Sequence, residues 1–277
     1  MSLTYPPDRH LLRDLRLSFE HGDDDGSSVA WMPVVPELST TDGSVRAGAL
    51  ATLVDVIGGG LAASAAHPDW IATADLTLHL TGAASQGSVE ARAQVVHAGR
   101  TTVVIEVALH DHAGAEIGIA TMSFARLARR DENPDITTSR VAGPSTMALP
   151  DSRLQAPLLD ELQVRVVDAA RGEIEAPIGE WSRNSLGSMQ GGVVATLVDA
   201  AAEVAAGAAS GEQLVVADIQ LTYLALARVG PVRSRVEVLS QRGGSVAAHV
   251  ELIDEGSDSR VTSIARVVAT RSLRGAA

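Results

Sequence analysis

The chain has 277 residues, of which 45% are hydrophobic and 20% charged, and its formal net charge is −12. This composition is typical of a globular protein with one large core or two modest ones, and the negative charge argues against a nucleic-acid partner. The sequence contains no cysteine, which excludes disulfides and thiolate metal sites. The first ten residues have neither a basic start nor an apolar stretch, so we expect no signal peptide and a cytoplasmic location.

The first half of the chain predicts a short amphipathic helix, two strands, a long helix and then an antiparallel meander. Residues 10–19 read as a helix that runs into a strand, residues 21–26 (HGDDDG) as a turn, and residues 27–35 as the returning strand. A run of small and apolar residues follows at 47–66, with Asp55 as its only charge. Strands are then predicted at residues 74–80, 87–98, 101–111 and 116–127.

The run at residues 47–66 is long enough to suggest a membrane span. Asp55 and the triplet Gly58, Gly59 and Gly60 argue against that interpretation, and the similar run at residues 191–209 contains two acids, Asp199 and Glu203. A helix that is apolar all round is otherwise one buried in a protein core. We therefore expect two buried helices and no membrane partner.

The second half repeats the same order of elements after a separate linker. Residues 129–154 carry charges and prolines without periodicity, which is typical of a linker between an N-terminal unit at 1–128 and a C-terminal unit at 155–277. A helix-to-strand passage, a turn near residues 169–172 and a strand that ends at Pro177 come next. The long helix is followed by strands predicted at residues 217–224, 230–240, 245–254 and 259–272.

The two halves also repeat in sequence. VRAGALATLVD ends at Asp55 and MQGGVVATLVD ends at Asp199, which is an offset of 199 − 55 = 144 residues. Gly48 falls on Gly192 with the same offset, while Thr73 in TADLTLHL faces Val216 in VADIQLTY one residue out of step. Self-similarity at half the chain length indicates a duplicated unit rather than a solenoid of short repeats. Two such units are expected to pack as an internal dimer.

The segment before the second helix resembles a known family. Asn184, Gly187, Gln190, Gly191 and Gly192 stand at the spacing of the N-x-x-G-x-x-H-G-G segment of hotdog acyl-CoA thioesterases of the phenylacetyl-CoA thioesterase-like group, with Gln190 in place of the histidine. The resemblance implies an α+β fold, a double hotdog in which a curved antiparallel sheet wraps each long helix and the two sheets join. It also implies further association of double units into a homo-oligomer.

The resemblance implies a composite site in which a carboxylate of one unit faces the helix start of the other. Its residues are Asp55 as nucleophile or base, Gly191 N–H as the oxyanion donor, Gln190 and Asn184 as orienting groups, and Thr73 as the assisting hydroxyl. An acid kept inside an apolar helix despite the cost of burial is a candidate for function on physical grounds as well. Gly192 and Arg100 are expected to bind substrate, Arg100 through the phosphates of coenzyme A.

A second, weaker site is expected around Asp199 and Ala47. There the counterpart of Gln190 is the bulky Arg46, and the hydroxyl of Thr73 is replaced by Val216. We therefore expect one fuller site and one poorer one.

Three functions are compatible with these patterns. The first is hydrolysis of an acyl-CoA thioester without a metal or redox cofactor. The second is a non-catalytic acyl-CoA-binding or assembly module, which the replacement of histidine by Gln190 keeps open. The third, a hotdog hydratase or dehydratase, requires a histidine and acid pair, and no histidine stands near either helix start.

Overall fold

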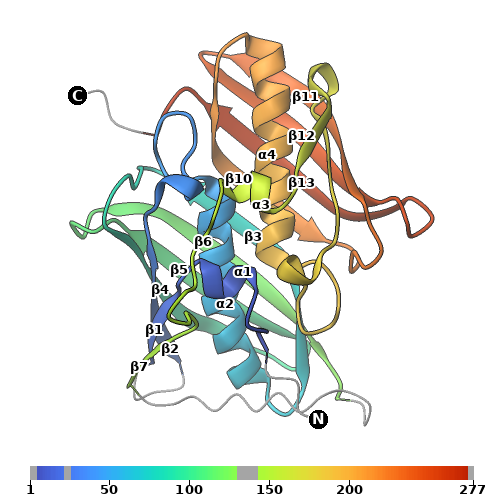
Figure 1. Ribbon diagram of the computed structural model, residues 1–277. Coiled ribbons are helices and arrows are strands. Elements are labelled where there is room, and N and C mark those ends of the chain that lie inside the picture. The colour runs from blue at the N-terminus through green and yellow to red at the C-terminus, as the bar shows by residue number, and fades with distance from the viewer. Residues whose placement is uncertain (1–4, 22–25, 130–142, 274–277) are drawn as a thin grey trace.

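The computed structural model describes residues 5–21, 26–129 and 143–273. Within these residues, one antiparallel sheet of 13 strands runs through both halves of the chain. The two long helices, α2 (Ala47–Ala66) and α4 (Gly191–Ser210), pack side by side on the same face of the sheet (Figure 1). Each helix covers the strands of its own half, so that every half is one helix wrapped by one portion of the sheet.

The elements follow the predicted order in both halves. The first half contains α1 (Leu11–Asp14), β1 (Ser18–His21), β2 (Ser27–Pro33), η1 (Pro36–Leu38), α2, β3 (Trp70–Leu80), β4 (Ser88–Ala98), β5 (Thr102–His110), β6 (Glu116–Leu127) and β7 (Gly143–Thr146). The second contains α3 (Leu158–Glu161), β8 (Arg165–Asp168), η2 (Ala169–Arg171), β9 (Glu173–Ala176), η3 (Glu180–Ser182), α4, β10 (Val215–Tyr223), β11 (Val232–Arg242), β12 (Ser245–Asp254) and β13 (Arg260–Thr270). The turn predicted at residues 21–26 lies largely outside the described residues.

The order of strands across the sheet shows the duplication directly. From one edge to the other the order is β7-β1-β2-β4-β5-β6-β3-β10-β13-β12-β11-β9-β8. The central sequence β2-β4-β5-β6-β3 is therefore mirrored by β10-β13-β12-β11-β9, with the axis of the pair between β3 and β10. This arrangement is the α+β double unit with joined sheets that the sequence predicts.

Strands β3 and β10 join the two units in an antiparallel ladder in which Leu76 lies opposite Leu221. The carboxylate of Asp75 accepts hydrogen bonds from Ser123 Oγ at 2.9 Å and, across the junction, from Thr222 Oγ1 at 2.8 Å. Asp218, the counterpart of Asp75, pairs with His79 of the other unit. Both acids therefore tie the two units together.

The two helices approach so closely that glycine is required where they touch. A Cβ on Gly48 would lie 2.4 Å from Thr196 Cα, and a Cβ on Gly192 would lie 2.5 Å from Thr52 Cα. The two threonine hydroxyls are satisfied within their own helices, because Thr52 Oγ1 donates to Gly48 O and Thr196 Oγ1 to Gly192 O, each at 2.9 Å. The contact therefore brings the start of each helix against the first half of the other.

Burial distinguishes these helices from membrane spans. By length and composition alone both α2 and α4 could cross a membrane, but 67% and 72% of their apolar windows are buried inside the fold. Their apolar side chains pack on the sheet and on each other, as in a core helix.

Part of the predicted linker has regular structure. Residues 143–146 form β7, which pairs with β1 at the edge of the sheet, with Phe19 opposite Ser145. The residues of this strand show no periodicity because a four-residue edge strand is too short to display one. Residues 130–142 of the same predicted segment lie outside the described residues.

The close helix contact predicts a position-specific effect of glycine substitution. Gly48→Ala places a methyl group against the backbone of Thr196, which no rotamer change relieves, so we expect a loss of about 1–3 kcal/mol in the free energy of unfolding. Gly60→Ala is the matched control, because Gly60 is an exposed residue of the same helix with no atom near its Cβ position. Urea unfolding of both variants measures the difference. Equal stability of the two would contradict the contact.

Candidate active site

Asp55 accepts hydrogen bonds from both units of the molecule. It lies in the middle of α2 and is 8% exposed. Thr73 Oγ1, on β3 of the same unit, donates to Asp55 Oδ1 at 3.0 Å. Gln190 Nε2, at the start of α4 in the other unit, donates to Asp55 Oδ2 at 2.7 Å, and the backbone N–H of Gly192 also bonds the carboxylate. The structure therefore brings Thr73 of one unit and Gln190 and Gly192 of the other together on Asp55.

The orientation of the Gln190 amide is fixed from both ends. Gln190 is the N-cap residue of α4, and its Oε1 accepts a hydrogen bond from Val193 N at 3.0 Å. Its nitrogen is the end that donates to Asp55. Reversing the amide would lose both bonds, so the helix cap holds the donor on the carboxylate.

Gly191 is the first residue of α4, where a backbone N–H has no partner within the helix. A Cβ at this position would lie 2.9 Å from both carboxylate oxygens of Asp55, so only glycine allows the helix start to approach the acid this closely. The Gly191 N–H has no hydrogen-bond partner among the residues that the structure describes, and the positive end of the helix dipole lies beside Asp55, where negative charge on an oxygen is stabilised.

Tyr223, which is absent from the site residues predicted from the sequence, bonds the backbone of this helix start. Its phenol OH, at the end of β10, donates to Gly191 O at 2.9 Å. Burial, followed by the charge of Asp55, raises the pKa of Tyr223, so that the OH remains a donor. The repeat contained a signal for Tyr223, because a polar aromatic residue stands there at the position that Leu80 occupies in the aligned first copy.

Burial is the main influence on the ionisation of Asp55. It raises the pKa of this carboxyl from 3.8 to about 6, while the hydrogen bonds from Thr73, Gly192 and Gln190 act in the opposite direction. None of these three donors carries a full charge. Asp55 is therefore ionised at neutral pH and poised to take up a proton, as a general base or nucleophile requires.

Asn184 stabilises the loop that precedes α4. Its Oδ1 accepts hydrogen bonds from Leu186 N at 2.9 Å and from Ser188 N at 3.1 Å, and its Nδ2 donates to Met189 O at 3.5 Å. None of the bonds that this side chain makes to the described residues reaches Asp55. Asn184 was expected to orient groups at the site, and the geometry gives it an indirect effect through the loop, since an asparagine oxygen readily closes such a turn.

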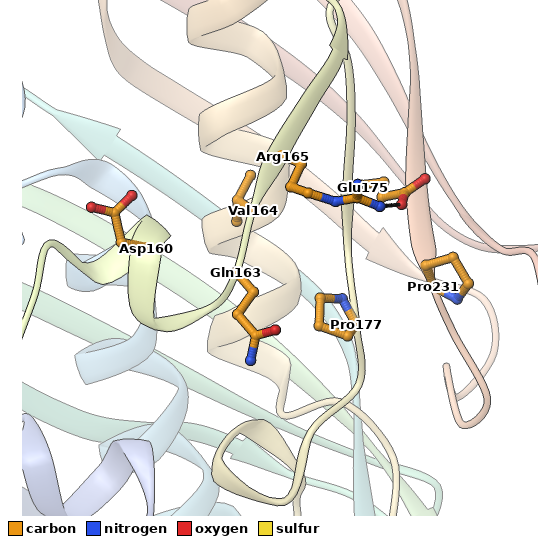
Figure 2. A pocket seen from close by; sticks show the side chains of 7 residues that line it. All are labelled: Asp160, Gln163, Val164, Arg165, Glu175, Pro177 and Pro231. Carbon is orange, nitrogen blue, oxygen red and sulfur yellow. Dashed lines mark hydrogen bonds and ion pairs between the residues drawn. The ribbon is translucent and has the colours of Figure 1, made fainter.

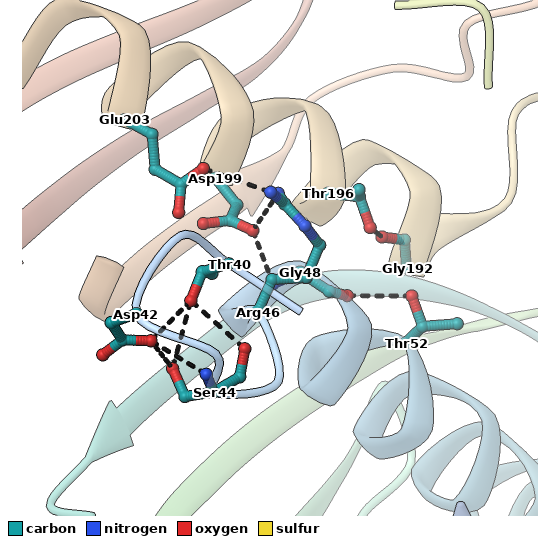
Figure 3. Close-up of polar contacts among 10 residues, drawn as sticks. All are labelled: Thr40, Asp42, Ser44, Arg46, Gly48, Thr52, Gly192, Thr196, Asp199 and Glu203. Carbon is teal, nitrogen blue, oxygen red and sulfur yellow. Dashed lines mark hydrogen bonds and ion pairs between the residues drawn. The ribbon is translucent and has the colours of Figure 1, made fainter. Parts of the chain in front are cut away.

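The equivalent position in the other unit is filled by an ion pair (Figure 3). Asp199 is 0% exposed, and its Oδ2 accepts from Gly48 N at 3.0 Å, just as Asp55 accepts from Gly192. Arg46 replaces Gln190 here. Its Nη1 donates to Asp199 Oδ2 at 2.9 Å and its Nη2 to Glu203 Oε2 at 3.2 Å.

The cluster of Arg46, Asp199 and Glu203 has two acids for one cation. Burial and the neighbouring charge of Asp199 raise the pKa of Glu203 to about 8, and burial also raises that of Asp199. Asp199 receives two donors and Glu203 one, so the ionised form of Asp199 is the better stabilised of the two. The carboxylate of Asp199 thus has the full positive charge of Arg46 beside it, whereas the donors around Asp55 are uncharged. Ala47, the counterpart of Gly191, is buried at this helix start.

The N-terminal segment fastens the loop before α4 from the first unit. His10 Nδ1 accepts from Leu12 N at 3.1 Å, which places the ring proton on Nε2, and Nε2 bonds Arg183 O at 2.7 Å. Tyr5 OH donates to the same carbonyl at 3.4 Å. Burial lowers the pKa of His10, consistent with a neutral ring. Neither Tyr5 nor His10 could be predicted from its local sequence, because the partner of both residues lies in the other unit.

Arg100 lies at the far end of α2 from the helix contact. It is exposed in the turn between β4 and β5, and Arg126 ties that turn to the helix end by donating to Gly99 O at 2.9 Å and to Ala66 O at 2.7 Å. Along a helix axis, Ala66 is about 16 Å from Asp55. The binding of a phosphate by Arg100 stays a prediction.

Two surface cavities lie away from Asp55. One of about 560 Å³ is lined by Asp160, Gln163, Val164, Arg165, Glu175, Pro177 and Pro231 (Figure 2). The other, of about 210 Å³, lies beyond the end of α4, where Arg271 is paired with Glu212. Neither contains Asp55 or Gln190. The site is therefore defined by its polar contacts rather than by these cavities.

Comparison with known families identifies the class of protein that this geometry belongs to. The family model of the thioesterase superfamily matches residues 42–117 and again residues 186–261, an offset of 186 − 42 = 144 residues. The chain belongs to the thioesterase superfamily, in its tandem hotdog form. No curated protein matches the sequence.

Solved structures share the fold over most of the chain. An acyl-ACP thioesterase from Bacteroides thetaiotaomicron superposes with a TM-score of 0.59 at 13% identity, covering 90% of this chain and 100% of its own. The tesB protein of Mycobacterium avium subspecies paratuberculosis gives a TM-score of 0.61 at 12% identity, covering 92% of this chain and 95% of its own. The 12:0-ACP thioesterase of Umbellularia californica gives 0.60 at 12% identity, with 89% and 94% covered. At these identities the likeness shows the double hotdog fold alone.

The raised pKa of Asp55 predicts a pH-dependent stability difference. Between 3.8 and about 6 the folded chain holds this proton more tightly than the unfolded chain, so ionisation destabilises the fold as pH rises through that window. Relative to Asp55→Asn, the wild type should lose up to about 3 kcal/mol of unfolding free energy between about pH 4 and pH 7, at 1.4 kcal/mol per pKa unit. Urea unfolding at several pH values measures both proteins. Parallel pH curves would contradict the shift.

The Arg46 cluster predicts a strongly coupled set of substitutions. Arg46→Met leaves two acids buried without their cation, and we expect it to cost about 3–5 kcal/mol of unfolding free energy. The triple variant Arg46→Met, Asp199→Asn, Glu203→Gln removes the charges together and should recover most of that loss. Chemical denaturation of the two variants at neutral pH provides the comparison. A triple variant no more stable than the single one would refute the ion-pair role.

Proposed function

We propose that the protein hydrolyses acyl-CoA thioesters at a single composite site formed by Asp55 and the start of α4. The observation that carries this proposal is the buried Asp55 carboxylate, held by uncharged donors beside the free N–H of Gly191. Membership of the thioesterase superfamily supports the reaction class. Coenzyme A as the carrier, the cytoplasm as the location and a homo-oligomer of double units are parts of the same proposal.

The proposed reaction uses the two sides of the site in different ways. The thioester carbonyl lies beside Asp55 and the helix start, with its oxygen toward Gly191 N–H. Asp55 takes a proton from a water molecule as that water attacks the carbonyl carbon, and the negative charge that develops on oxygen is stabilised by the N–H and the helix dipole. The tetrahedral intermediate then expels the thiolate, which receives the proton from Asp55.

The number of hydrogen bonds at Asp55 is compatible with this role. A carboxylate offers about four acceptor positions, and Thr73, Gln190 and Gly192 use three of them. One position remains for the attacking water. Direct attack by Asp55 on the carbonyl, with a mixed anhydride hydrolysed afterwards, uses the same residues.

Gln190 would orient the carboxylate without titrating. Its amide stays neutral at every relevant pH, so the activity would follow the ionisation of Asp55 and show no limb from a histidine at the helix start. Substrate recognition would include Arg100, whose turn is fastened to the end of α2.

The proposed function predicts unequal effects at the two acids. The wild type should release free thiol from acyl-CoA substrates, and Asp55→Asn should lower kcat/KM by about 10²–10⁴, the range for removing a general base. Asp199→Asn is the matched control and should retain most of the activity, because Arg46 already occupies its site. Thiol release with a chromogenic reagent measures all three, and circular dichroism checks that each variant is folded.

The assay also separates the alternatives. Equal losses in the two variants would refute the single-site proposal. Two of the structural relatives are ACP thioesterases by name, so acyl-ACP belongs in the substrate panel. Binding of CoA esters without hydrolysis of any substrate would replace the enzyme by the non-catalytic binding module.

A further inference from the structure

The surroundings of Asp55 and of Asp199 differ at two equivalent positions, which lie on the same side of each acid's helix. With the offset of 144 residues, Gln190 corresponds to Arg46 and Gly59 corresponds to Glu203. Gly59 lies four residues after Asp55, and Glu203 four residues after Asp199, so each pair occupies one face of its helix. The site around Asp55 therefore has the amide of Gln190 and no side chain at Gly59, whereas the site around Asp199 has the guanidinium of Arg46 and the carboxyl group of Glu203.

Around Asp199 this face is covered by side chains. Arg46 spans one helical turn, from Asp199 to Glu203, and the side chains of Arg46 and Glu203 are only 7% and 18% exposed (Figure 3). Asp199 itself is out of contact with solvent. The pair of Arg46 and Glu203 therefore closes the surface beside the acid.

Around Asp55 the same face is open. Gln190 ends at Asp55, and Gly59 has no side chain to cover the turn that follows. Apart from the backbone of its own helix, Phe124 Cε1 is the only atom of the described residues within 4 Å of a Cβ built on Gly59, at 3.9 Å. Gly59 is half-buried and Asp55 keeps 8% of its surface exposed, so this face is less covered than the one around Asp199.

We infer that Gly59 is a specificity-determining position, and that the acyl group of the substrate lies along α2 over Gly59. This inference rests on the proposed thioester hydrolysis. The carbonyl must sit beside Asp55 and the start of α4, so one of its two substituents runs along this face. An apolar acyl group suits it better than the amide-bearing arm of coenzyme A, because the one neighbour near Gly59 is an aromatic ring without polar atoms.

Length gives the inference a measurable form. Residue 59 is about 6 Å along the helix axis from residue 55, at 1.5 Å per residue. An acetyl group ends before it reaches Gly59, whereas a hexanoyl or phenylacetyl group extends over it. A side chain at position 59 should therefore exclude the larger acyl groups and spare the smallest one.

The test compares Gly59→Leu with Gly60→Leu on acetyl-, hexanoyl- and phenylacetyl-CoA. Both changes replace a glycine in the same helix, but Gly60 is exposed and has no atom near its Cβ position. In Gly59→Leu, kcat/KM for hexanoyl- and phenylacetyl-CoA should fall at least about tenfold more than for acetyl-CoA, in the range for steric discrimination in a pocket. In Gly60→Leu the ratio between substrates should stay that of the wild type. Gly59→Ala provides a milder version if the leucine variant does not fold.

Equal losses for all three substrates would place the CoA arm at Gly59 and overturn the inference, as would an unchanged ratio. If the wild type hydrolyses none of them, the proposed function fails, and binding still tests position 59. Calorimetry with the non-hydrolysable thioether analogue of phenylacetyl-CoA should then show weaker binding to Gly59→Leu than to the wild type, with unchanged binding of free coenzyme A. Equal affinity of the analogue for both proteins would overturn the inference on its own.

Discussion

The contact of α2 with α4 through glycine is the constraint on which the rest of the structure depends. Packed helices are usually separated by 8–10 Å, with side chains between them. Here the backbone at Gly48 meets Thr196, and the backbone at Gly192 meets Thr52. Only this approach brings the carboxylate of one helix within reach of the N–H groups that begin the other. The composite site is thus a product of helix packing before it is a product of any single polar residue.

One position in the fold has two electrostatic solutions. Asp55 and Asp199 both accept a backbone N–H from the opposite helix start, and both bear the cost of burial in an apolar helix. Neutral donors offset that cost for Asp55 and leave its charge available to a reacting group. For Asp199 the cation Arg46 offsets the cost of burial and pairs with the negative charge. The two acids thus differ in the charge of a single partner, which is the neutral Gln190 at Asp55 and the cationic Arg46 at Asp199.

The sequence predicted the elements well because each has a strong local pattern. The run of small and apolar residues, with Asp55 as its only charge, predicted α2 at residues 47–66, the bounds that the structure shows, and the strands after it follow from their β-branched residues. Repetition of ATLVD predicted two joined units. The resemblance to the hotdog thioesterases implied Thr73 and Gln190 as site residues, and the structure places both on Asp55.

What the sequence could not predict depends on contacts between distant segments. Arg46 was recognised as a departure from the family pattern, but its bridge to Asp199 and Glu203 exists only once the two helices are packed. The hydrogen bond between His10 Nε2 and Arg183 O likewise joins one unit to the other. Asn184 has the residue type that the motif requires, and only the coordinates show that its oxygen turns back into its own loop.

Joining the units through β3 and β10 in one chain changes what evolution can do with them. In a dimer of identical subunits, an arginine at the helix start would appear at both interfaces at once and remove both sites together. A fused pair has no such symmetry, because each copy of a position mutates alone. One interface can therefore become a permanent internal brace, as Arg46 makes it, while the other stays free to diverge in the substrates it accepts.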